Sequence, residues 1–277
     1  TDPASLVRAA EGCRYVFHVA ADYRIWAPDP SGMRRANVDG TIAMLQAAQS
    51  AGVERIVYCS SVAALGHAIA DRLADETTPV DPSAMISAYK RSKYEAEQAV
   101  LALARQGLPV VIVNPAAPVG PRDIKPTPTG RMILDAASGW TPAYVDTGLN
   151  VVHVDDVAEG HVLALERGVV GERYILGGEN LTLKELFTLV AAATGHRPPM
   201  IRLPLEAVWP VAFGMEMLAR IGGFEPRVTR DYLRMARHKM FFSSAKAMRE
   251  LGYAPRPAAQ AVADAVAWFR GVGMLRT

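Results

Sequence analysis

Tyr89 and Lys93 are the residues of this chain whose types and spacing most directly suggest chemistry. On a helix, residues four positions apart lie on the same face, so a phenol and an ammonium can reach one reacting atom. A free tyrosine, with a pKa near ~10, is a poor proton carrier at neutral pH. A cation about 4 Å from the phenolate stabilises it by roughly 4 kcal/mol at an effective dielectric constant near 20, which is about three pKa units. The pair therefore predicts a general acid and base that works near neutral pH.

Two predicted strands would bring polar side chains to the same place as this pair. The segment 54–60 is apolar and β-branched and runs into Ser60 and Ser61, and the segment 108–114 ends at Asn114. Runs of this kind are typical of central parallel strands, which are buried on both faces. In open α/β sheets, ligands bind beyond the carboxyl ends of the strands. We therefore expect a site there, beside the helix that carries the tyrosine and the lysine.

Strands and helices alternate along the chain up to about Glu166, with a spacing that indicates βαβ units and a parallel sheet. Between Pro115 and Asn150 the chain is rich in Pro and Gly and is expected to form loops. From Thr182 onward the pattern is mostly helical, and Thr182-Leu-Lys-Glu185 is a capping-box signature. The other expected elements are a strand at 14–20 and helices at 33–51, 85–106, 155–167 and 182–194.

The composition limits the classes of function. With 30 Lys and Arg against 28 Asp and Glu, the net charge is +2, which gives no reason to expect a nucleic-acid partner. Two cysteines, Cys13 and Cys59, are too few for a disulfide framework and suit a reducing cytosol, so we expect a cytoplasmic protein. The apolar tract 203–223 contains Pro210 and charged residues, which argue against a membrane span. We expect a helix packed over a substrate cleft or, alternatively, a face that touches a membrane or a lipid-like substrate.

Motifs spread along nearly the whole chain resemble those of a known family, in the family's order. They are His18-Val-Ala-Ala21, Asn37-Val-Asp-Gly-Thr41, Ser60-Ser61, Tyr89-x-x-x-Lys93, Asn114-Pro-x-x-x-Val-Gly-Pro121, Val152-His-Val-Asp-Asp-Val157, Tyr174-x-Leu-Gly-Gly-Glu-Asn180 and Lys246-Ala-x-x-Glu-Leu-Gly-Tyr-x-Pro255. The chain resembles the extended short-chain dehydrogenase/reductases, also called the NAD-dependent epimerase/dehydratase family. Within the family it is most similar to the branch of the hopanoid-associated sugar epimerase and the dihydroflavonol-reductase-like proteins. The resemblance implies an α/β fold with a Rossmann-type, doubly wound parallel sheet and a smaller, mostly helical C-terminal substrate lobe.

The resemblance also implies a division into domains. Residues 1–120 and 151–168 would form the dinucleotide-binding Rossmann domain, and residues 121–150 and 169–277 the substrate-binding lobe. The family opens with a strand, a Gly-rich turn and a helix that hold the cofactor pyrophosphate, but no G-x-x-G-x-x-G occurs in this sequence. We therefore expect the first strands of the sheet to be absent and the strand at 14–20 to be an exposed, apolar edge. We also expect that these residues alone do not fold into a soluble, cofactor-binding protein.

The resemblance implies a role for each catalytic residue. Tyr89 would exchange a proton with the substrate hydroxyl, Lys93 would hold the ribose of NAD or NADP, and Ser61 would hydrogen-bond the reacting oxygen. We prefer Ser61 to Ser60 because Gly66 follows it at the family's spacing. The remaining residues expected at the cofactor are Val19, Ala20, Ala21, Asn37, Val113, Pro115, Ala116 and Ala117. For Asn37, a helix N-cap is a second and compatible role.

Candidates for substrate contact are Tyr23, Asn114 and Arg122. Packing on the surface is an equal interpretation for Tyr23, as it is for the neighbouring Arg24 and Trp26. A lone Arg in a loop is often a solvated charge, which is the alternative for Arg122.

Two acidic segments suggest other chemistry but have simpler interpretations. His153, Asp155 and Asp156 would cap a helix and anchor a loop, and we expect no metal, because a third ligand at useful spacing is missing. Glu97 lies four residues after Lys93 and is expected to form a surface pair.

The motifs together predict an NAD(P)-dependent enzyme that acts on a secondary alcohol or ketone, as a sugar epimerase or as a ketone reductase. Its substrate would be a sugar nucleotide or a hydrophobic alcohol or ketone, and the resemblance implies a homodimer. Val62 and Ala63 stand where dehydratases of the family usually have an acid, which argues against that branch. The alternatives are a non-catalytic, dinucleotide-sensing protein and a lipid-handling protein on the same fold, with peripheral membrane contact.

Overall fold

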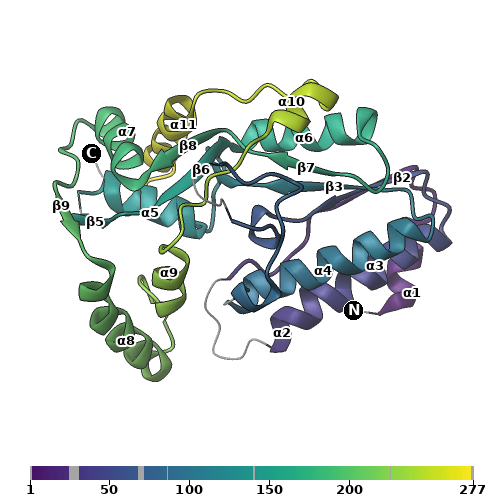
Figure 1. Cartoon of the computed structure of the whole chain (residues 1–277), viewed down its shortest axis with the longest axis horizontal. Coiled ribbons are helices and arrows are strands. Elements are labelled where there is room, and N and C mark those ends of the chain that lie inside the picture. The colour runs from purple at the N-terminus through teal and green to yellow at the C-terminus, as the bar shows by residue number, and fades with distance from the viewer. Residues whose placement is uncertain are drawn as a thin grey trace.

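The computed structural model covers the 277 residues and describes residues 2–24, 31–67, 72–85, 87–139, 141–224 and 226–275. Its centre is a parallel sheet of four strands in the order β1-β2-β3-β7 (Figure 1). These strands are β1 (Tyr15–His18), β2 (Arg55–Cys59), β3 (Val110–Pro115) and β7 (Arg173–Leu176). The expected α/β fold with a parallel sheet is confirmed, and the expected strands differ from the observed ones by one or two residues at each end.

The two central strands are buried on both faces because their side chains alternate between two helical layers. One layer consists of α3 (Gly40–Ser50) and α4 (Ala88–Arg105), and the other of α6 (Val154–Arg167) and α10 (Ala245–Leu251). Ile56, Tyr58, Val110 and Ile112 pack toward α3 and α4. Val57, Val111 and Val113 pack toward α6 and α10. Continuous apolar runs in the sequence therefore mark the strands that are covered on both sides.

Strand β1 lies at the edge of this sheet. It pairs with β2 alone among the described strands, and Tyr15 and Phe17 are 40% and 43% exposed. Helix α1 (Pro3–Ala10) begins at the Asp2 cap and packs on α3. The expected exposed, apolar edge is confirmed. The expectation that these residues alone do not fold stays a prediction, as does the division into domains.

A second group of elements lies beside the central sheet, toward the C-terminus (Figure 1). Strands β4 (Ala117–Val119), β6 (Gly148–His153) and β8 (Glu179–Thr182) form one small sheet, and β5 (Ala143–Val145) pairs with β9 (Ile201–Leu203). Helices α5 (Pro128–Ala137), α7 (Leu183–Thr194) and α11 (Ala258–Gly271) pack together in a separate apolar core. The expected capping box is present at the start of α7. The expectation of loops between Pro115 and Asn150 was incomplete, because α5 begins at a proline and most of its apolar residues face this core.

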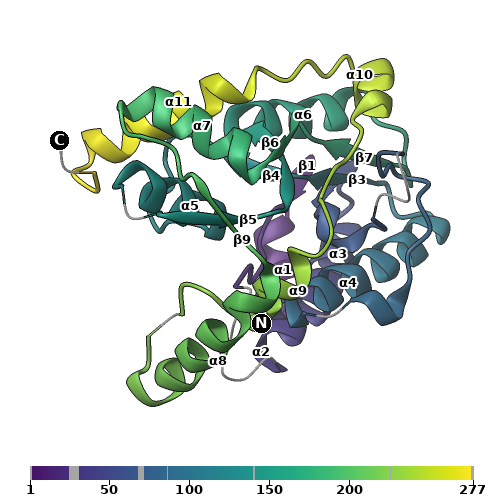
Figure 2. The same ribbon diagram turned by 60° about the vertical axis from the view of Figure 1, so that its left-hand side comes forward.

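The apolar tract 203–223 forms α8 (Leu205–Gly222), which projects away from the rest of the molecule (Figures 1 and 2). It packs against α9 (Arg230–Met235) and buries Ala212, Glu216 and Ala219. The expected helix is confirmed, but most of its large apolar side chains are exposed rather than packed over a cleft. Within the described residues, no helix combines the length and the hydropathy that crossing a membrane requires.

Candidate active site

The N-terminus of α4 brings Tyr89 and Lys93 to the carboxyl edge of the central sheet. Ser87 caps the helix by accepting a hydrogen bond from the Lys90 backbone, so Tyr89 lies in the first turn and Lys93 in the second. Lys93 is buried, and its Nζ donates to the carbonyl of Cys59, the last residue of β2, at 2.9 Å. The same ammonium lies 5.4 Å from the centre of the Tyr58 ring. The lysine is therefore held by the end of a strand and not by an acidic side chain.

Ser61 is the second residue after β2 and lies near the tyrosine. Its hydroxyl caps the short 3₁₀ turn Val62–Ala64 by accepting from the Ala63 backbone at 3.1 Å. It also lies close enough to the phenol of Tyr89 to act on the pKa of that group. The hydroxyl of Ser60 is buried and has no hydrogen-bond partner among the described residues. Of the two serines, the structure brings Ser61 into contact with the tyrosine.

The protonation of Tyr89 differs from the expectation. Burial raises the pKa of the Tyr89 phenol, and the nearby Ser61 hydroxyl opposes this shift only in part. Burial also lowers the pKa of Lys93. The sequence argument assumed that the ammonium lies against the phenolate in a solvated setting, whereas both groups are desolvated and Lys93 points to the Cys59 carbonyl. The expected lowering of the tyrosine pKa is therefore wrong for this structure, and Tyr89 is a protonated phenol at neutral pH.

Asn37 lies in a π-helical turn, Arg35–Asp39, that interrupts the helix expected at 33–51. Its side-chain amide donates to the Asp22 carbonyl at 2.8 Å and to the Ser92 hydroxyl at 3.0 Å, while its oxygen accepts from the Asp22 backbone at 2.7 Å. Single π turns often occur at functional sites. The alternative role as a helix N-cap is wrong, because Asn37 instead fixes the segment after β1 to helix α4.

A buried network of polar groups supports the other side of α4. The amide of Asn114, at the end of β3, donates to the Ser61 carbonyl at 3.0 Å and to Glu97 at 2.6 Å. Glu97 also forms an ion pair with Arg173 at 3.2 Å. Asn114 is completely buried, so these contacts give it a role in positioning Ser61, and direct contact with a substrate stays a prediction.

The expected surface pair of Glu97 with Lys93 is wrong. Glu97 is 0% exposed and lies inside the fold, where Arg173 of β7 reaches it. Its spacing of four residues from Lys93 and eight from Tyr89 places it on the inner face of the helix, and that periodicity could have revealed its burial.

The residues expected at the cofactor gather along the same edge of the sheet. Val19 and Ala20 follow β1 and are exposed, and Ala21 is half-buried beside the segment that Asn37 holds. Small side chains at a strand end leave the backbone open to close approach by a ligand. Val113 and Pro115 are buried in β3, while Ala116 and Ala117 are half-buried beyond it. This set fits the ribose and nicotinamide half of a dinucleotide, and Lys93 and Asn37 are the polar groups there; their contacts with a cofactor stay predictions.

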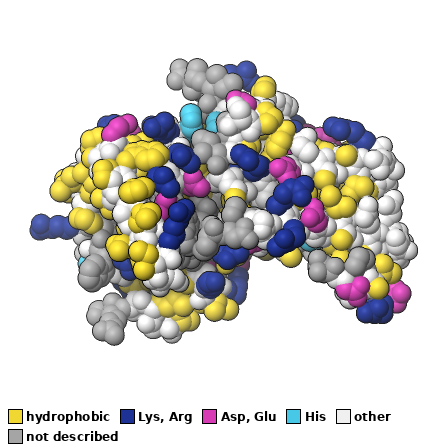
Figure 3. Space-filling view, turned by 90° about the horizontal axis from the view of Figure 1, so that it is seen from below, with side chains coloured by type: hydrophobic (Ala, Val, Ile, Leu, Met, Phe, Trp, Pro, Cys, Tyr) yellow, Lys and Arg dark blue, Asp and Glu magenta, His cyan; other side chains and the backbone are white. Residues whose placement is uncertain are grey.

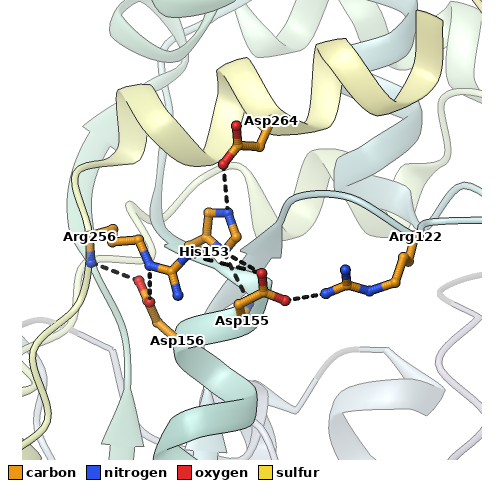
Figure 4. Close-up of polar contacts among 6 residues, drawn as sticks. All are labelled: Arg122, His153, Asp155, Asp156, Arg256 and Asp264. Carbon is orange, nitrogen blue, oxygen red and sulfur yellow. Dashed lines mark hydrogen bonds and ion pairs between the residues drawn. The ribbon is translucent and has the colours of Figure 1, made fainter. Parts of the chain in front are cut away.

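The residues that were expected to contact the substrate lie in different parts of the structure. Tyr23 is 44% exposed in the segment after β1, next to an ion pair between Arg24 and Asp22. Trp26 lies outside the described residues. Arg122 has a φ of 69°, an uncommon conformation for a residue with a side chain, and its guanidinium pairs with Asp155 (Figure 4). Substrate contact by Tyr23 or Arg122 stays a prediction.

His153, Asp155 and Asp156 form the anchor that the sequence indicated (Figure 4). The Nδ1 of His153 caps α6 by accepting from the Asp155 backbone at 3.0 Å, which leaves Nε2 to donate to Asp264 of α11 at 3.2 Å. Asp156 accepts from the backbone and the guanidinium of Arg256 at 2.7 and 2.6 Å. Helix capping and loop anchoring are confirmed. Within the described residues, no three His, Cys, Asp or Glu side chains lie close enough to hold a metal ion.

Comparisons with known proteins agree with this architecture. Residues 1–177 match the NAD dependent epimerase/dehydratase family. A protein of Synechocystis sp. provisionally named dihydroflavonol 4-reductase is 44% identical, over 96% of this chain and 79% of its own length. Sterol demethylase protein B of Methylococcus capsulatus is 36% identical, over 99% of this chain and 84% of its own. The crystal structure of gox2253 is 61% identical with a TM-score of 0.87, over 99% of this chain and 84% of that one.

The chain therefore belongs to the NAD-dependent epimerase/dehydratase family, whose members are NAD(P)-dependent epimerases, dehydratases and reductases. The expected family, the Rossmann-type fold and the dependence on NAD or NADP are confirmed. The dihydroflavonol-reductase-like relationship is confirmed as well.

Proposed function

We propose that this enzyme interconverts a secondary alcohol and a ketone, with Ser61, Tyr89 and Lys93 as its catalytic residues. The observation that carries the proposal is that the Ser61 hydroxyl lies close enough to the Tyr89 phenol to oppose the rise of its pKa, one helical turn from a buried Lys93 at the carboxyl edge of the sheet. A proton donor, a hydroxyl that can stabilise oxygen charge and a cation thus meet where ligands of open α/β sheets bind.

Each side chain has a separate task in this reaction. When bound, NAD(P) supplies or accepts the hydride. Tyr89 gives a proton to the carbonyl oxygen during reduction and takes it back during oxidation. Ser61 donates a hydrogen bond to the same oxygen, whose negative charge develops in the transition state. Lys93, one turn further along α4, would hold the ribose of the bound cofactor. Because burial raises the pKa of Tyr89, the phenol starts protonated, which favours the reductive direction.

A ketone reductase or dehydrogenase with a hydrophobic substrate is the form of this function that we favour. The two curated relatives described above carry names that refer to a dihydroflavonol and a sterol, both of which have polycyclic carbon skeletons. A sugar epimerase, including the hopanoid-associated type, is the second candidate, because the matching family model is named for epimerases and dehydratases. An epimerase oxidises and reduces with the same bound cofactor, so reduced nicotinamide does not accumulate; net consumption of NAD(P)H with a ketone would separate the reductase from it.

Replacing Tyr89 by Phe tests the catalytic assignment. Tyr89→Phe removes the proton that the substrate needs, so we expect kcat to fall by roughly 10²–10⁴-fold. Tyr94→Phe, on the same helix and also half-buried, is the matched control and should keep the wild-type rate. Wild-type turnover by the Tyr89 variant, measured with NAD(P)H consumption, would remove the catalytic role of Tyr89. Lost turnover with unchanged cellular function would instead support the dinucleotide-sensing alternative.

The exposed surface of helix α8 supports a further proposal, that the protein contacts an anionic membrane surface. Six large apolar residues on it or just after it are exposed: Val211, Phe213, Met217, Leu218, Ile221 and Phe224. Between residues 196 and 239 the sequence has eight Lys and Arg against four Asp and Glu, although the whole chain is nearly balanced. Figure 3, which views the molecule from below, shows hydrophobic side chains interspersed with basic ones on its left-hand side. Apolar side chains framed by cations suit the interface of anionic lipids.

Vesicle co-sedimentation tests this membrane contact. Wild-type protein should sediment with anionic vesicles and, because of the apolar contact, partly resist high salt. Ile221→Ser with Leu218→Ser should reduce binding, whereas Val169→Ser, at an exposed site on another face, should not. If the double variant binds as the wild type does, α8 does not contact the membrane. If vesicles bind neither protein, a second copy of the chain is the remaining candidate to cover the exposed apolar side chains of α8, and light scattering should then show the expected homodimer.

The two free cysteines, Cys13 and Cys59, support a reducing, cytosolic setting.

A further inference from the structure

Lys90 is a buried cation without an anionic partner, directly after Tyr89 on α4. Its side chain is 3% exposed. The ammonium lies 3.1 Å from Nε2 of His67 and 3.9 Å from the sulfur of Met240, and within the described residues these are its polar contacts. Burying an ammonium costs several kcal/mol unless a counter-charge offsets it, and an imidazole and a thioether supply none.

His67 adds a buried hydrogen-bond donor without an acceptor. An ammonium can only donate, so Nε2 of His67 accepts from Lys90 and the proton of the neutral ring is on Nδ1. This Nδ1 is buried and has no partner among the described residues. The exposed His238 stacks on the same ring, with centroids 5.1 Å apart and an angle of 8° between the planes.

The cluster lies beside the proposed catalytic tyrosine and is assembled from three parts of the chain. Lys90 comes from α4, and His67 comes from the segment after the Ser61-capped turn, which packs on α4. A side chain at Gly66 would collide with the carbonyl of Pro79, so this segment is tightly fixed. His238 and Met240 come from the chain after α9, where the Met240 backbone donates to Gly148 of β6 at 2.9 Å.

We propose that Lys90, His67 and His238 form a subsite for an acidic group of the substrate, a carboxylate or a phosphate. This group would lie next to the alcohol or ketone with which Tyr89 exchanges a proton. The anion would accept a hydrogen bond from Nδ1 of His67, and Lys90, on the opposite nitrogen of the same ring, would supply the counter-charge through that ring, on which His238 stacks. This inference rests on the proposed function and narrows its substrate to a molecule with an apolar body and one acidic group.

The charge states of the free protein agree with such a subsite. Burial lowers the pKa of Lys90 to about 8. Burial, Lys90 and His238 together lower the pKa of His67 to about 4. No carboxylate faces either group in the described part of the chain. A bound anion would raise both pKa values, so binding near pH 8 should take up protons.

Calorimetric titration of the full-length protein with acetate and with inorganic phosphate tests the subsite. The protein is first saturated with NAD, so that phosphate cannot occupy the cofactor site. Titrations at about pH 8 in buffers of different ionisation enthalpy give affinity and proton uptake together. We expect at least one anion to bind in the millimolar range with proton uptake. Tighter binding of acetate would indicate a carboxylated substrate, and tighter binding of phosphate a phosphorylated one.

Three variants decide whether the cluster is responsible. Lys90→Met keeps the length of the side chain without its charge and should weaken binding at least tenfold, with loss of proton uptake. His67→Gln should weaken binding as well, and it serves as the second variant if Lys90→Met does not fold. Lys239→Met removes an exposed cation next to His238 and should bind as the wild type does. Equal affinity in Lys90→Met and wild type, or no binding of either anion in the millimolar range, would overturn the subsite.

The same titration in Tyr89→Phe separates this inference from the proposed function. Anion binding that persists in that variant, combined with unchanged turnover, would reject the catalytic role but keep the subsite. Lost turnover without anion binding in any variant would keep the catalytic role and reject the subsite.

Discussion

Helix α4 carries three buried charged side chains, and two of them, Glu97 and Lys90, have opposite kinds of partner. Glu97 meets the guanidinium of Arg173 at 3.2 Å and the amide of Asn114 at 2.6 Å. Lys90, seven residues earlier and equally buried, meets the imidazole of His67 at 3.1 Å. The carboxylate thus has a cation and a donor, whereas the ammonium has an acceptor without charge.

This difference in partners means that the Glu97 charge supports the fold, whereas the Lys90 charge lowers its stability. A buried ion pair with satisfied hydrogen bonds roughly offsets its own desolvation, and removing one partner leaves the other uncompensated. A buried cation without a counter-charge has no such offset, and destabilising groups of this kind concentrate at functional sites. We therefore expect stability to fall when the Glu97 pair is broken and to rise when the Lys90 charge is removed.

Breaking the Glu97 pair should give the largest change in stability. Glu97→Gln keeps the shape of the side chain but leaves Arg173 without its carboxylate, and we expect a loss of about 3 kcal/mol in the free energy of unfolding. Urea denaturation followed by circular dichroism measures it.

Glu95→Gln is the matched control for that variant. Glu95 pairs with Arg34 at 2.9 Å on the same helix, but both side chains are solvent-accessible, and a pair of this kind contributes about 1 kcal/mol or less. Similar losses in the two variants would contradict the contrast between buried and exposed pairs.

Removing the Lys90 charge should have the next largest effect, with the opposite sign. Lys90→Met should raise the free energy of unfolding by about 1–3 kcal/mol at neutral pH, because the pKa of Lys90 falls from 10.5 to about 8 on burial. The same denaturation experiment measures it, with Lys239→Met expected to stay within about 0.5 kcal/mol of the wild type. A destabilised Lys90→Met would show that the lysine supports the fold.

The smallest effect is the pH dependence of the stability that Lys90→Met gains over the wild type. The folded pKa of Lys90, about 8, lies below the unfolded value of 10.5, so between these values the unfolded chain binds more protons and wild-type stability rises with pH. The advantage of Lys90→Met should therefore be complete below about pH 8 and disappear toward pH 10.5. Denaturation curves of both proteins at several pH values measure this difference, and an advantage that is constant with pH would assign the gain to packing.

Local sequence patterns were sufficient for much of the fold and for part of the site. The continuous apolar runs marked β2 and β3, and the spacing of Tyr89 and Lys93 placed them correctly on one helix, because both signals depend on neighbours within a few residues. The π turn at Asn37 was missed because it has no strong local signature. Helix α5 was missed although the Thr127 cap and Pro128 mark its start, because it lies within a Pro- and Gly-rich stretch. The protonation of Tyr89 was wrong because desolvation depends on atoms from distant parts of the chain.

The sequence by itself determined the family, the parallel sheet and the placing of Tyr89 and Lys93 on one helix, because motif order and periodicity are properties of the linear chain. Only the tertiary structure decided which buried charges have partners. Arg173 reaches Glu97 from a strand 76 residues away, and no acidic residue reaches Lys90 among those described. Residues distant in the sequence set the electrostatic environment of a buried group, so no pattern along the chain could have told the two charges apart.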